Sequence, residues 1–256
     1  MSRAWKSFDD EISRWRDLGR SVDFWWRDDD AARHALELSR LLDLATACAI
    51  PLALAVVPVG ADRGLLKGAT PEISALQHGV DHINRAGPDE KKTEFPSHEP
   101  VENALQRLAG GLGQLTLAAG TRAVPVLAPP WNRLHPALIP ELANAGYRGL
   151  STFGPRAKAR PAPGLSQVNT HVDIIDWKGG RGFAGVDQVL GQAIGHLEAR
   201  RAGRVDAQEP TGWLTHHAVH DEAAWSFLER LFDVTRGVAG VRWLKVDALF
   251  DLECEQ

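Results

Sequence analysis

Acidic and imidazole side chains stand close together at several points of this chain, in patterns suited to holding a metal ion. The segment HGVDH supplies His78 and His82, four residues apart, and on a helical turn that spacing puts both rings on one side. A hydrolytic zinc site uses about three protein ligands from histidine and carboxylate side chains. The run Asp28–Asp30 offers a third ligand and, beside it, a free carboxylate that can act as general base on a metal-activated water.

A general acid for the leaving group is the remaining requirement, and histidine suits that role because its pKa lies near neutrality. His216 and His217 end the apolar run GWLTHH, and Asp176 could pair with His216 and keep it protonated. Asp173 and Asp176 are equally typical of salt bridges or turns. His171, in the same segment as Asp173, receives no chemical role.

The composition is that of a globular protein without affinity for polyanions. The 256 residues, 44% hydrophobic and 24% charged, suffice for one large domain spanning 1–256 with its own core. A net charge of −4 gives no support for a nucleic-acid or membrane partner. Cys48 and Cys254 make no disulfide framework, and the first residues lack the apolar stretch of a secretory signal. We therefore expect a cytoplasmic protein.

The elements that must position these residues alternate between short apolar strands and longer helices. We expect strands at 22–26, 51–57, 73–78, 123–128, 147–152, 168–176, 212–217 and 241–246. Helical patterns cover 32–48, 101–118, 135–145, 186–202 and 221–236. Alternation of this kind predicts a parallel α/β fold, and no glycine-rich phosphate loop follows any strand. Because the carboxyl ends of parallel strands share one face, the polar clusters should meet there.

The order of these motifs resembles that of the NodB-homology polysaccharide deacetylases, carbohydrate esterase family four. That family carries, in order, T-F-D-D-G, H-[ST]-x-x-H, R-x-P-[YW], D-x-x-D-W-like and L-x-H motifs. The corresponding segments here are RDDDA (27–31), HGVDH (78–82), APPW (128–131), DIIDW (173–177) and LTH (214–216). Five motifs in the same order across most of the chain make the resemblance specific.

The resemblance implies a role for each matched side chain. Aligned without a gap, RDDDA makes Asp29 the catalytic base and Asp30 a metal ligand, whereas a shift by one residue would select Asp28 and Asp29. His78 and His82 become the other two ligands of a divalent metal ion, zinc before others.

The later motifs supply the acid and the substrate pocket. By resemblance, His216 protonates the leaving amine, Asp176 tunes His216, and Trp177 forms a wall of the pocket. The expected substrate-binding residues are Pro130, Trp131, Asn132 and Trp177, with the backbone N–H of Trp131 helping to stabilise the oxyanion. The implied fold is an α/β distorted (β/α) barrel of about seven parallel strands.

Three departures from the family pattern set this chain apart. Ala128 replaces the arginine of the third motif, which orients the base, so that Arg27 or Arg133 would have to substitute for it. Gly79 stands where the family has serine or threonine, and Ala31 stands where it has glycine.

The leading hypothesis is therefore a metal-dependent hydrolase that removes acetyl groups from N-acetylated sugars or glycans. Two alternatives stay open: hydrolysis of cyclic amides or ureides on the same barrel, and a non-catalytic carbohydrate-binding protein on a decayed barrel, which Ala128 alone favours. The sequence does not indicate the oligomeric state. Residues in or beside the motifs without a firm role are Asp28, Asp173, His171, His217 and Arg27.

Overall fold

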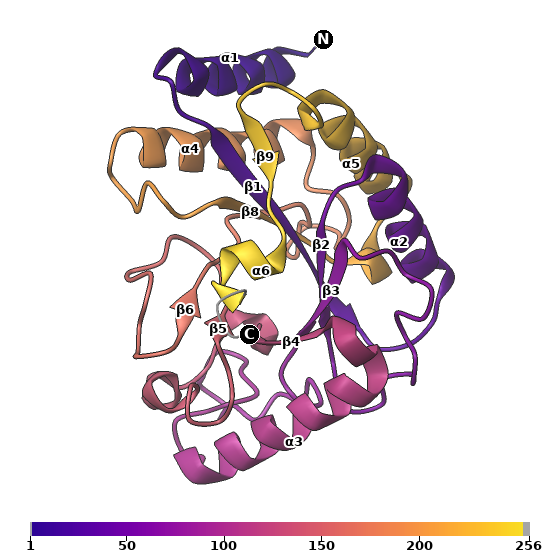
Figure 1. The fold of residues 1–256 in the computed structure, drawn as a ribbon, viewed down its shortest axis with the longest axis vertical. Coiled ribbons are helices and arrows are strands. Elements are labelled where there is room, and N and C mark those ends of the chain that lie inside the picture. Colours follow the sequence, from indigo (N-terminus) through magenta and orange to yellow (C-terminus); the bar gives the residue numbers. More distant parts are fainter. Residues whose placement is uncertain (1, 253–256) are drawn as a thin grey trace.

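A curled parallel sheet forms the centre of the protein (Figure 1). The computed structural model describes residues 2–252, and in them nine strands follow the order β6-β5-β4-β3-β2-β1-β8-β7, with β9 beside β1. Every pairing between these strands is parallel. The bounds are β1 Val22–Ala31, β2 Leu52–Val56, β3 Ile73–Gln77, β4 Ala123–Leu127, β5 Gly149–Leu150, β6 Ser166–Gln167, β7 Val172–Asp173, β8 Thr211–Thr215 and β9 Val241–Trp243.

One extended segment, residues 166–173, brings the two edges of the sheet together. Its first part is β6, which pairs with β5, and its last part is β7, which pairs with β8. Between them the N–H of Thr170 donates to the carbonyl of Thr152 at 3.0 Å, and that of His171 donates to Gly212 at 2.7 Å. Of the single strand expected over 168–176, only β7 is formed, and β6 lies just before that range. The predicted distorted barrel is confirmed.

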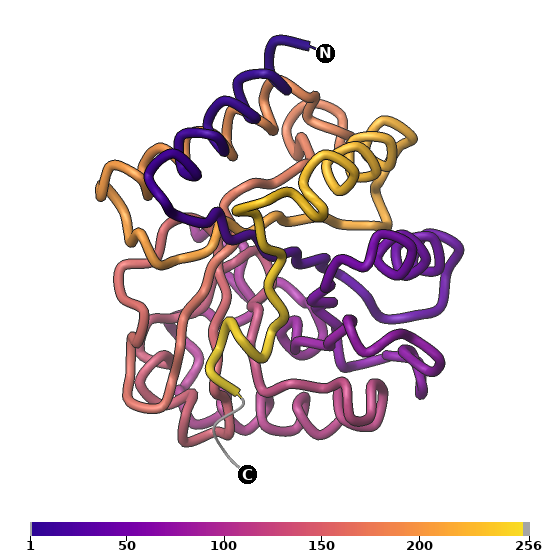
Figure 2. Tube along the Cα trace, turned by 45° about the horizontal axis from the view of Figure 1, so that its top comes forward, coloured from indigo at the N-terminus to yellow at the C-terminus, as the bar shows by residue number. Residues whose placement is uncertain are grey.

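Helices surround this sheet, as the tube view shows (Figure 2). Their apolar faces pack on the outside of the strands, so that Phe24 and Trp26 of β1 lie in one core cluster with residues of α1, α2, α4 and α5. The bounds are α1 Arg3–Asp17, α2 Leu36–Cys48, α3 Val101–Ala119, α4 Val186–Arg201, α5 Glu222–Thr235 and α6 Val246–Leu249. Among residues 2–252, no helix is both long enough and apolar enough to cross a membrane.

Most expected elements are present, and the exceptions have local causes. The helix expected at 135–145 is a 3₁₀ turn, Pro136–Glu141, because Pro140 cannot donate the backbone hydrogen bond that an α-helix requires. The strand expected at 241–246 ends at Trp243, and α6 begins at Val246. Neither α1 nor α6 was expected. Cys254 lies outside the described residues.

Strand β1 distributes its side chains between two different interiors. Successive side chains of a strand point to opposite faces. Phe24 and Trp26 face the helices, whereas Trp25 belongs to the cluster inside the curled sheet with Phe250. Arg27 and Asp29 follow Trp25 at intervals of two, which places both on the inner face above that apolar floor.

A second group of polar side chains is buried at the other ends of the strands, where β7 and β8 begin. The rings of His171 and His196 stack with centroids 3.5 Å apart, and His171 Nε2 lies 3.3 Å from Glu209. The N–H of Gly212 donates to His171 Nδ1, so the proton of a neutral ring sits on Nε2. That proton and the nearly parallel rings, at 15°, leave no shared in-plane position for a metal ion. We interpret this cluster as structural.

Both rings of the cluster are kept neutral by their surroundings. Burial lowers the pKa of His171 despite Glu209 beside it. Burial lowers the pKa of His196 to about 2, aided by the repulsion that a protonated His196 would meet from the neighbouring His171 and Arg200. In an unfolded chain a histidine has a pKa near 6.5. Below that pH the unfolded state binds a proton at this histidine and the folded state does not, so acid favours unfolding.

We therefore predict that His196→Asn makes stability less sensitive to acid. Each such histidine removes about 1.4 kcal/mol of stability per pH unit below about 6.5, and the substitution eliminates one of them. Urea unfolding at pH 7, 6, 5 and 4 measures the slope. His34→Asn, at an exposed position, is the matched control and should keep the slope of the parent protein. Equal slopes for the two variants would contradict the assignment.

Candidate active site

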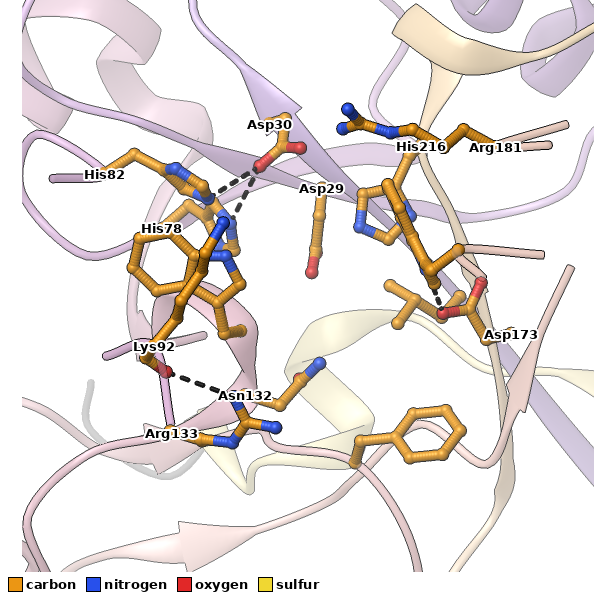
Figure 3. A pocket seen from close by; sticks show the side chains of 14 residues that line it. Asp29, Asp30, His78, His82, Lys92, Asn132, Arg133, Asp173, Arg181 and His216 are labelled. Carbon is orange, nitrogen blue, oxygen red and sulfur yellow. Dashed lines mark hydrogen bonds and ion pairs between the residues drawn. The ribbon is translucent and has the colours of Figure 1, made fainter. Parts of the chain in front are cut away.

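A cavity of about 750 Å³ opens at the carboxyl ends of the strands and collects most of the residues expected to do chemistry (Figure 3). Its volume is in the range of sites that bind small molecules. The expected site residues that line it are Asp29, Asp30, His78, His82, Trp131, Asn132, Trp177 and His216, together with Asp173. Pro130 and Asp176 are not part of its lining.

Asp30, His78 and His82 converge on one point of the cavity wall. Oδ1 of Asp30 lies 3.1 Å from Nε2 of His78 and 3.2 Å from Nε2 of His82. These separations suit three ligands that each stand about 2.0–2.2 Å from a shared ion. Burial alone would raise the pKa of Asp30, but the bonds from the two imidazoles outweigh it and lower that pKa. The carboxylate is therefore ionised at neutral pH.

The donor set fits a divalent metal ion of the zinc type. His78 Nδ1 lies 2.9 Å from the carbonyl oxygen of Ala128, which can only accept, so Nδ1 carries a proton. Nε2, which faces Asp30, is therefore the nitrogen that would bind a metal ion, in place of the proton that it shares with Asp30 in the absence of metal. Two imidazoles and one carboxylate are a common ligand set of catalytic zinc, with a position left open.

A bulge in β1 explains how adjacent aspartates reach the same cavity. In a regular strand Asp29 and Asp30 would point to opposite faces. The pairing of β1 with β2 shifts register between Asp28 and Ala31, and Asp30 has φ of 72°. Such a bulge redirects the side chain that follows it. Asp30 thereby turns toward the two histidines while Asp29 stays on the inner face.

Asp29 is held by Arg27 rather than by an arginine from the third motif. Nε and Nη2 of Arg27 donate to the two carboxylate oxygens at 2.8 and 3.0 Å. Arg27 also donates to Ser151 Oγ at 2.7 Å and to Asn132 Oδ1 at 2.6 Å, and its side chain is fully buried. Arg27 and Arg133 were the two residues expected to replace the arginine missing at position 128, and Arg27 is the one that binds Asp29.

Asp28, the third carboxylate, turns away from the cavity. Its Oδ1 accepts a bond from His217 Nδ1 at 2.5 Å, and its Oδ2 accepts from Thr215 Oγ1 at 2.6 Å. Burial would raise the pKa of Asp28, but His217 lowers it, and the same pairing raises the pKa of His217. The geometry therefore favours the register with Asp29 and Asp30 at the site, and the charged partner of Asp28 is His217.

The opposite wall carries His216, Trp177 and Asp173. The ring of Trp177 meets that of His216 edge-on, with centroids 4.7 Å apart, and donates through Nε1 to Asp173 at 2.8 Å. Burial raises the pKa of Asp173 although the nearby His216 opposes this. Asp176 instead accepts the backbone N–H groups of Lys178 and Gly179. The carboxylate beside His216 is thus Asp173, because Asp176 is occupied in a turn.

Glu94, which no pattern in the sequence singled out, holds the loop that carries His82. Its buried carboxylate accepts the backbone N–H groups of Val80, at 2.9 Å, and His82, at 3.2 Å. A Cβ on Gly79 would overlap with this carboxylate and lie 2.6 Å from Pro130 Cδ. Glycine stands at position 79 because the Glu94 carboxylate fills the space that a serine would need. The segment 79–100, which connects β3 with α3, is anchored there.

Left-handed backbone conformations concentrate at the cavity. Among the described residues, seven other than glycine have positive φ, and five of these line the cavity: Asp30, His82, Trp131, Asn132 and Arg181. Each such residue costs on the order of 1 kcal/mol relative to an ordinary conformation. Strained residues persist where the surroundings hold them, and they gather at functional sites.

Solved structures of several other proteins share this fold. A Mycobacterium smegmatis protein described as a polysaccharide deacetylase has a TM-score of 0.61 at 15% identity, covering 91% of this chain and 90% of its own. A family 4 acetyl xylan esterase from Clostridium thermocellum, in complex with cobalt, has 0.52 at 14%, covering 90% and 91%. A family 4 carbohydrate esterase from Streptomyces lividans, with acetate, has 0.54 at 12%, covering 86% and 90%.

The chain has the fold of the family-four carbohydrate esterases. This agrees with the resemblance that its five motifs carry, and it extends over about nine-tenths of the chain. No protein-family model and no curated protein sequence matches it.

Arg27→Gln should destabilise the protein by about 3–5 kcal/mol, because it leaves the carboxylate of Asp29 buried without a charged partner. Arg242→Gln is the matched control, since it breaks the pair of Arg242 with Asp23, in which the arginine is 62% exposed. That exposed pair should contribute at most about 1 kcal/mol. The free energies of unfolding come from urea titration at pH 7. Equal losses of unfolding free energy in the two variants would contradict the assignment, because they would show that burial adds nothing to the stabilisation by Arg27.

Gly79→Ser should weaken zinc binding about 10- to 100-fold, because the new side chain displaces Glu94 and shifts the loop that carries His82. Isothermal titration of the metal-free protein with zinc measures this. Gly110→Ser, on α3, places its side chain in open space and should bind zinc like the parent protein. Unchanged zinc affinity in Gly79→Ser would show that Glu94 does not position the residues that bind zinc.

Proposed function

We propose that this protein is a metal-dependent hydrolase that removes acetyl groups from N-acetylated sugars. The observation that carries the proposal is the convergence, in one cavity, of a three-ligand metal site, a carboxylate fixed by a buried arginine, and a histidine on the opposite wall. These groups are the ligands, base and acid that amide hydrolysis by an activated water requires.

Asp30, His78 and His82 would hold the divalent ion, for which zinc is the first candidate. When bound, such an ion polarises the acetyl carbonyl and makes water a stronger nucleophile at neutral pH. A related structure was solved with cobalt, which prefers similar ligands.

Asp29 is the proposed general base. Both of its oxygens accept from Arg27, which fixes the plane of the carboxylate without removing all of its lone pairs. Arg27 is itself held by Ser151 and Asn132, so the base cannot rotate away from the metal ligands. Asp29 takes a proton from the attacking water as the bond to the carbonyl carbon forms.

His216 is the proposed general acid. It faces Asp29 across the cavity (Figure 3), and its buried Nδ1 has no hydrogen-bond partner among the described residues. The edge of Trp177 fixes the ring, and Asp173 fixes Trp177. His216 donates a proton to the nitrogen as the amide bond breaks, which releases acetate and a free amino sugar.

The substrate would lie between aromatic side chains. Trp131 packs against His82 and Trp177 against His216, and both indoles line the cavity, where they can stack on sugar rings. The backbone N–H of Trp131 is proposed to donate a hydrogen bond to the oxyanion, in addition to the stabilisation that a bound ion would give. The family 4 esterase from Streptomyces lividans was solved with acetate, the product of such a reaction.

The non-catalytic alternative depended on the arginine missing at position 128. Ala128 is fully buried and its carbonyl orients His78, while Arg27 provides the guanidinium for Asp29. The arginine is therefore found at position 27 instead of position 128, and Ala128 no longer favours the non-catalytic alternative.

Asp29→Asn tests the role of the base separately from the metal. The variant should keep close to one divalent ion per chain, measured by elemental analysis, and lose acetate release from N-acetylglucosamine oligomers by about 10²- to 10⁴-fold. His78→Ala should lose both the ion and the activity, because it removes one of three ligands. Asp43→Asn, on the exposed face of α2, is the control for both measurements. Full activity in Asp29→Asn, or full metal content in His78→Ala, would sink the assignment.

A further inference from the structure

Three cationic side chains at the cavity have no role in the chemistry proposed above. Lys92, Arg133 and Arg181 line the cavity, and all three are exposed. Their side chains make no ion pair with an acidic group among residues 2–252: Arg133 donates to the backbone carbonyl of Lys92 at 3.1 Å, and Arg181 lies over the ring of Trp177. Three positive charges without counter-charges therefore surround one opening.

Each acidic side chain of the cavity already has a partner. Asp29 is paired with Arg27, and Asp30 with the two histidines that would share a metal ion. Asp173 accepts the indole N–H of Trp177. With a divalent ion bound, six positive charges (two of the ion, and one each of Arg27, Lys92, Arg133 and Arg181) would face three carboxylates. The chain as a whole carries −4, so this excess is local to the cavity.

The cations flank the cavity from two sides. Lys92 and Arg133 lie on the side of His82, whereas Arg181 lies on the side of His216 (Figure 3). The bond from Arg133 to the carbonyl of Lys92 ties two loops together. Arg181 has φ of 57°, and its N–H donates to the carbonyl of Asp176 at 2.9 Å. The chain thus accepts a strained backbone at a position that brings a guanidinium to the opening.

We propose that the substrate is an N-acetylated sugar that carries a negatively charged group, a carboxylate or a phosphate, which these three side chains bind. The inference rests on the proposed deacetylation, since it concerns the same cavity. Guanidinium groups pair with both anions through two parallel hydrogen bonds, and a lysine adds a point charge. Like charges that crowd an opening repel one another and the metal ion, and an anionic substrate removes that repulsion.

Paired substrates test the proposal directly. The zinc-loaded full-length protein is assayed for acetate release from neutral N-acetylglucosamine and its dimer, from the 1- and 6-phosphates of N-acetylglucosamine, and from N-acetylmuramic acid, which carries a carboxylate. We expect kcat/KM at least tenfold higher for a charged sugar than for the neutral ones. The phosphates and the carboxylate, compared with each other, identify the anion. The preference should shrink as NaCl rises from 20 to 500 mM, because salt screens exposed charges.

Charge-removing variants connect the preference to these side chains. Arg133→Gln and Arg181→Gln should each lower kcat/KM for the preferred anionic sugar about five- to tenfold, mostly through KM, and change it less than twofold for the neutral sugar. Lys92→Gln should behave in the same way. Lys91→Gln is the matched control, because Lys91 is the exposed neighbour of Lys92 and does not line the cavity.

The outcomes separate this inference from the proposed function. Deacetylation of neutral sugars with equal or higher kcat/KM would overturn the inference and leave the proposed function standing. Equal losses on neutral and anionic sugars in the variants would also overturn it. Binding of an anionic sugar, measured by titration calorimetry, without acetate release would overturn the proposed function and keep the inference. Neither binding nor turnover of any of these sugars would overturn both.

Discussion

The ion pair between Arg27 and Asp29 is the constraint on which the rest of the site depends. Both side chains are almost completely buried, 0% and 2% exposed, inside the curled sheet. A buried arginine cannot lose its proton, so each of its donors needs an acceptor. It finds them on three separate elements: Asp29 on β1, Ser151 after β5, and Asn132 in the turn after β4. The requirement to satisfy one guanidinium thus fixes the positions of Asp29, the proposed base, and of two segments of the cavity wall.

The position of this arginine follows from the geometry of a strand. Residues two apart on β1 lie on the same face, and a side chain as long as arginine reaches the carboxylate that follows it. An arginine at position 128, directly after β4, would have to reach Asp29 across the interior, because β2 and β3 lie between β1 and β4. Either strand can supply the guanidinium because both face the same interior. This chain therefore has alanine in place of the arginine of the third motif, and Arg27 forms the ion pair with Asp29.

Much of this arrangement could be predicted from the sequence, and the missing parts have a common cause. Strand–helix alternation and the polar residues at strand ends indicated the parallel fold and brought Asp30, His78, His82 and His216 to one face. The sequence could not select Asp173 over Asp176. Both stand in one short segment, and the choice depends on a turn in which Asp176 accepts two backbone N–H groups. Glu94 was missed for the same reason: its partners are backbone groups, which leave no residue pattern.

The segment around Glu94 couples the candidate metal site to the opening of the cavity. Glu94 holds the backbone that carries His82, and Lys92, two residues earlier, contributes its charge to the cavity. Arg107 on α3 donates to the carboxylate of Glu94 at 3.3 Å, so the segment is anchored to a helix. A displacement of Glu94 would therefore move His82, a proposed metal ligand, together with the cation Lys92. The candidate metal site and one of the three cations that would recognise an anionic substrate are thus held in place by the same buried carboxylate.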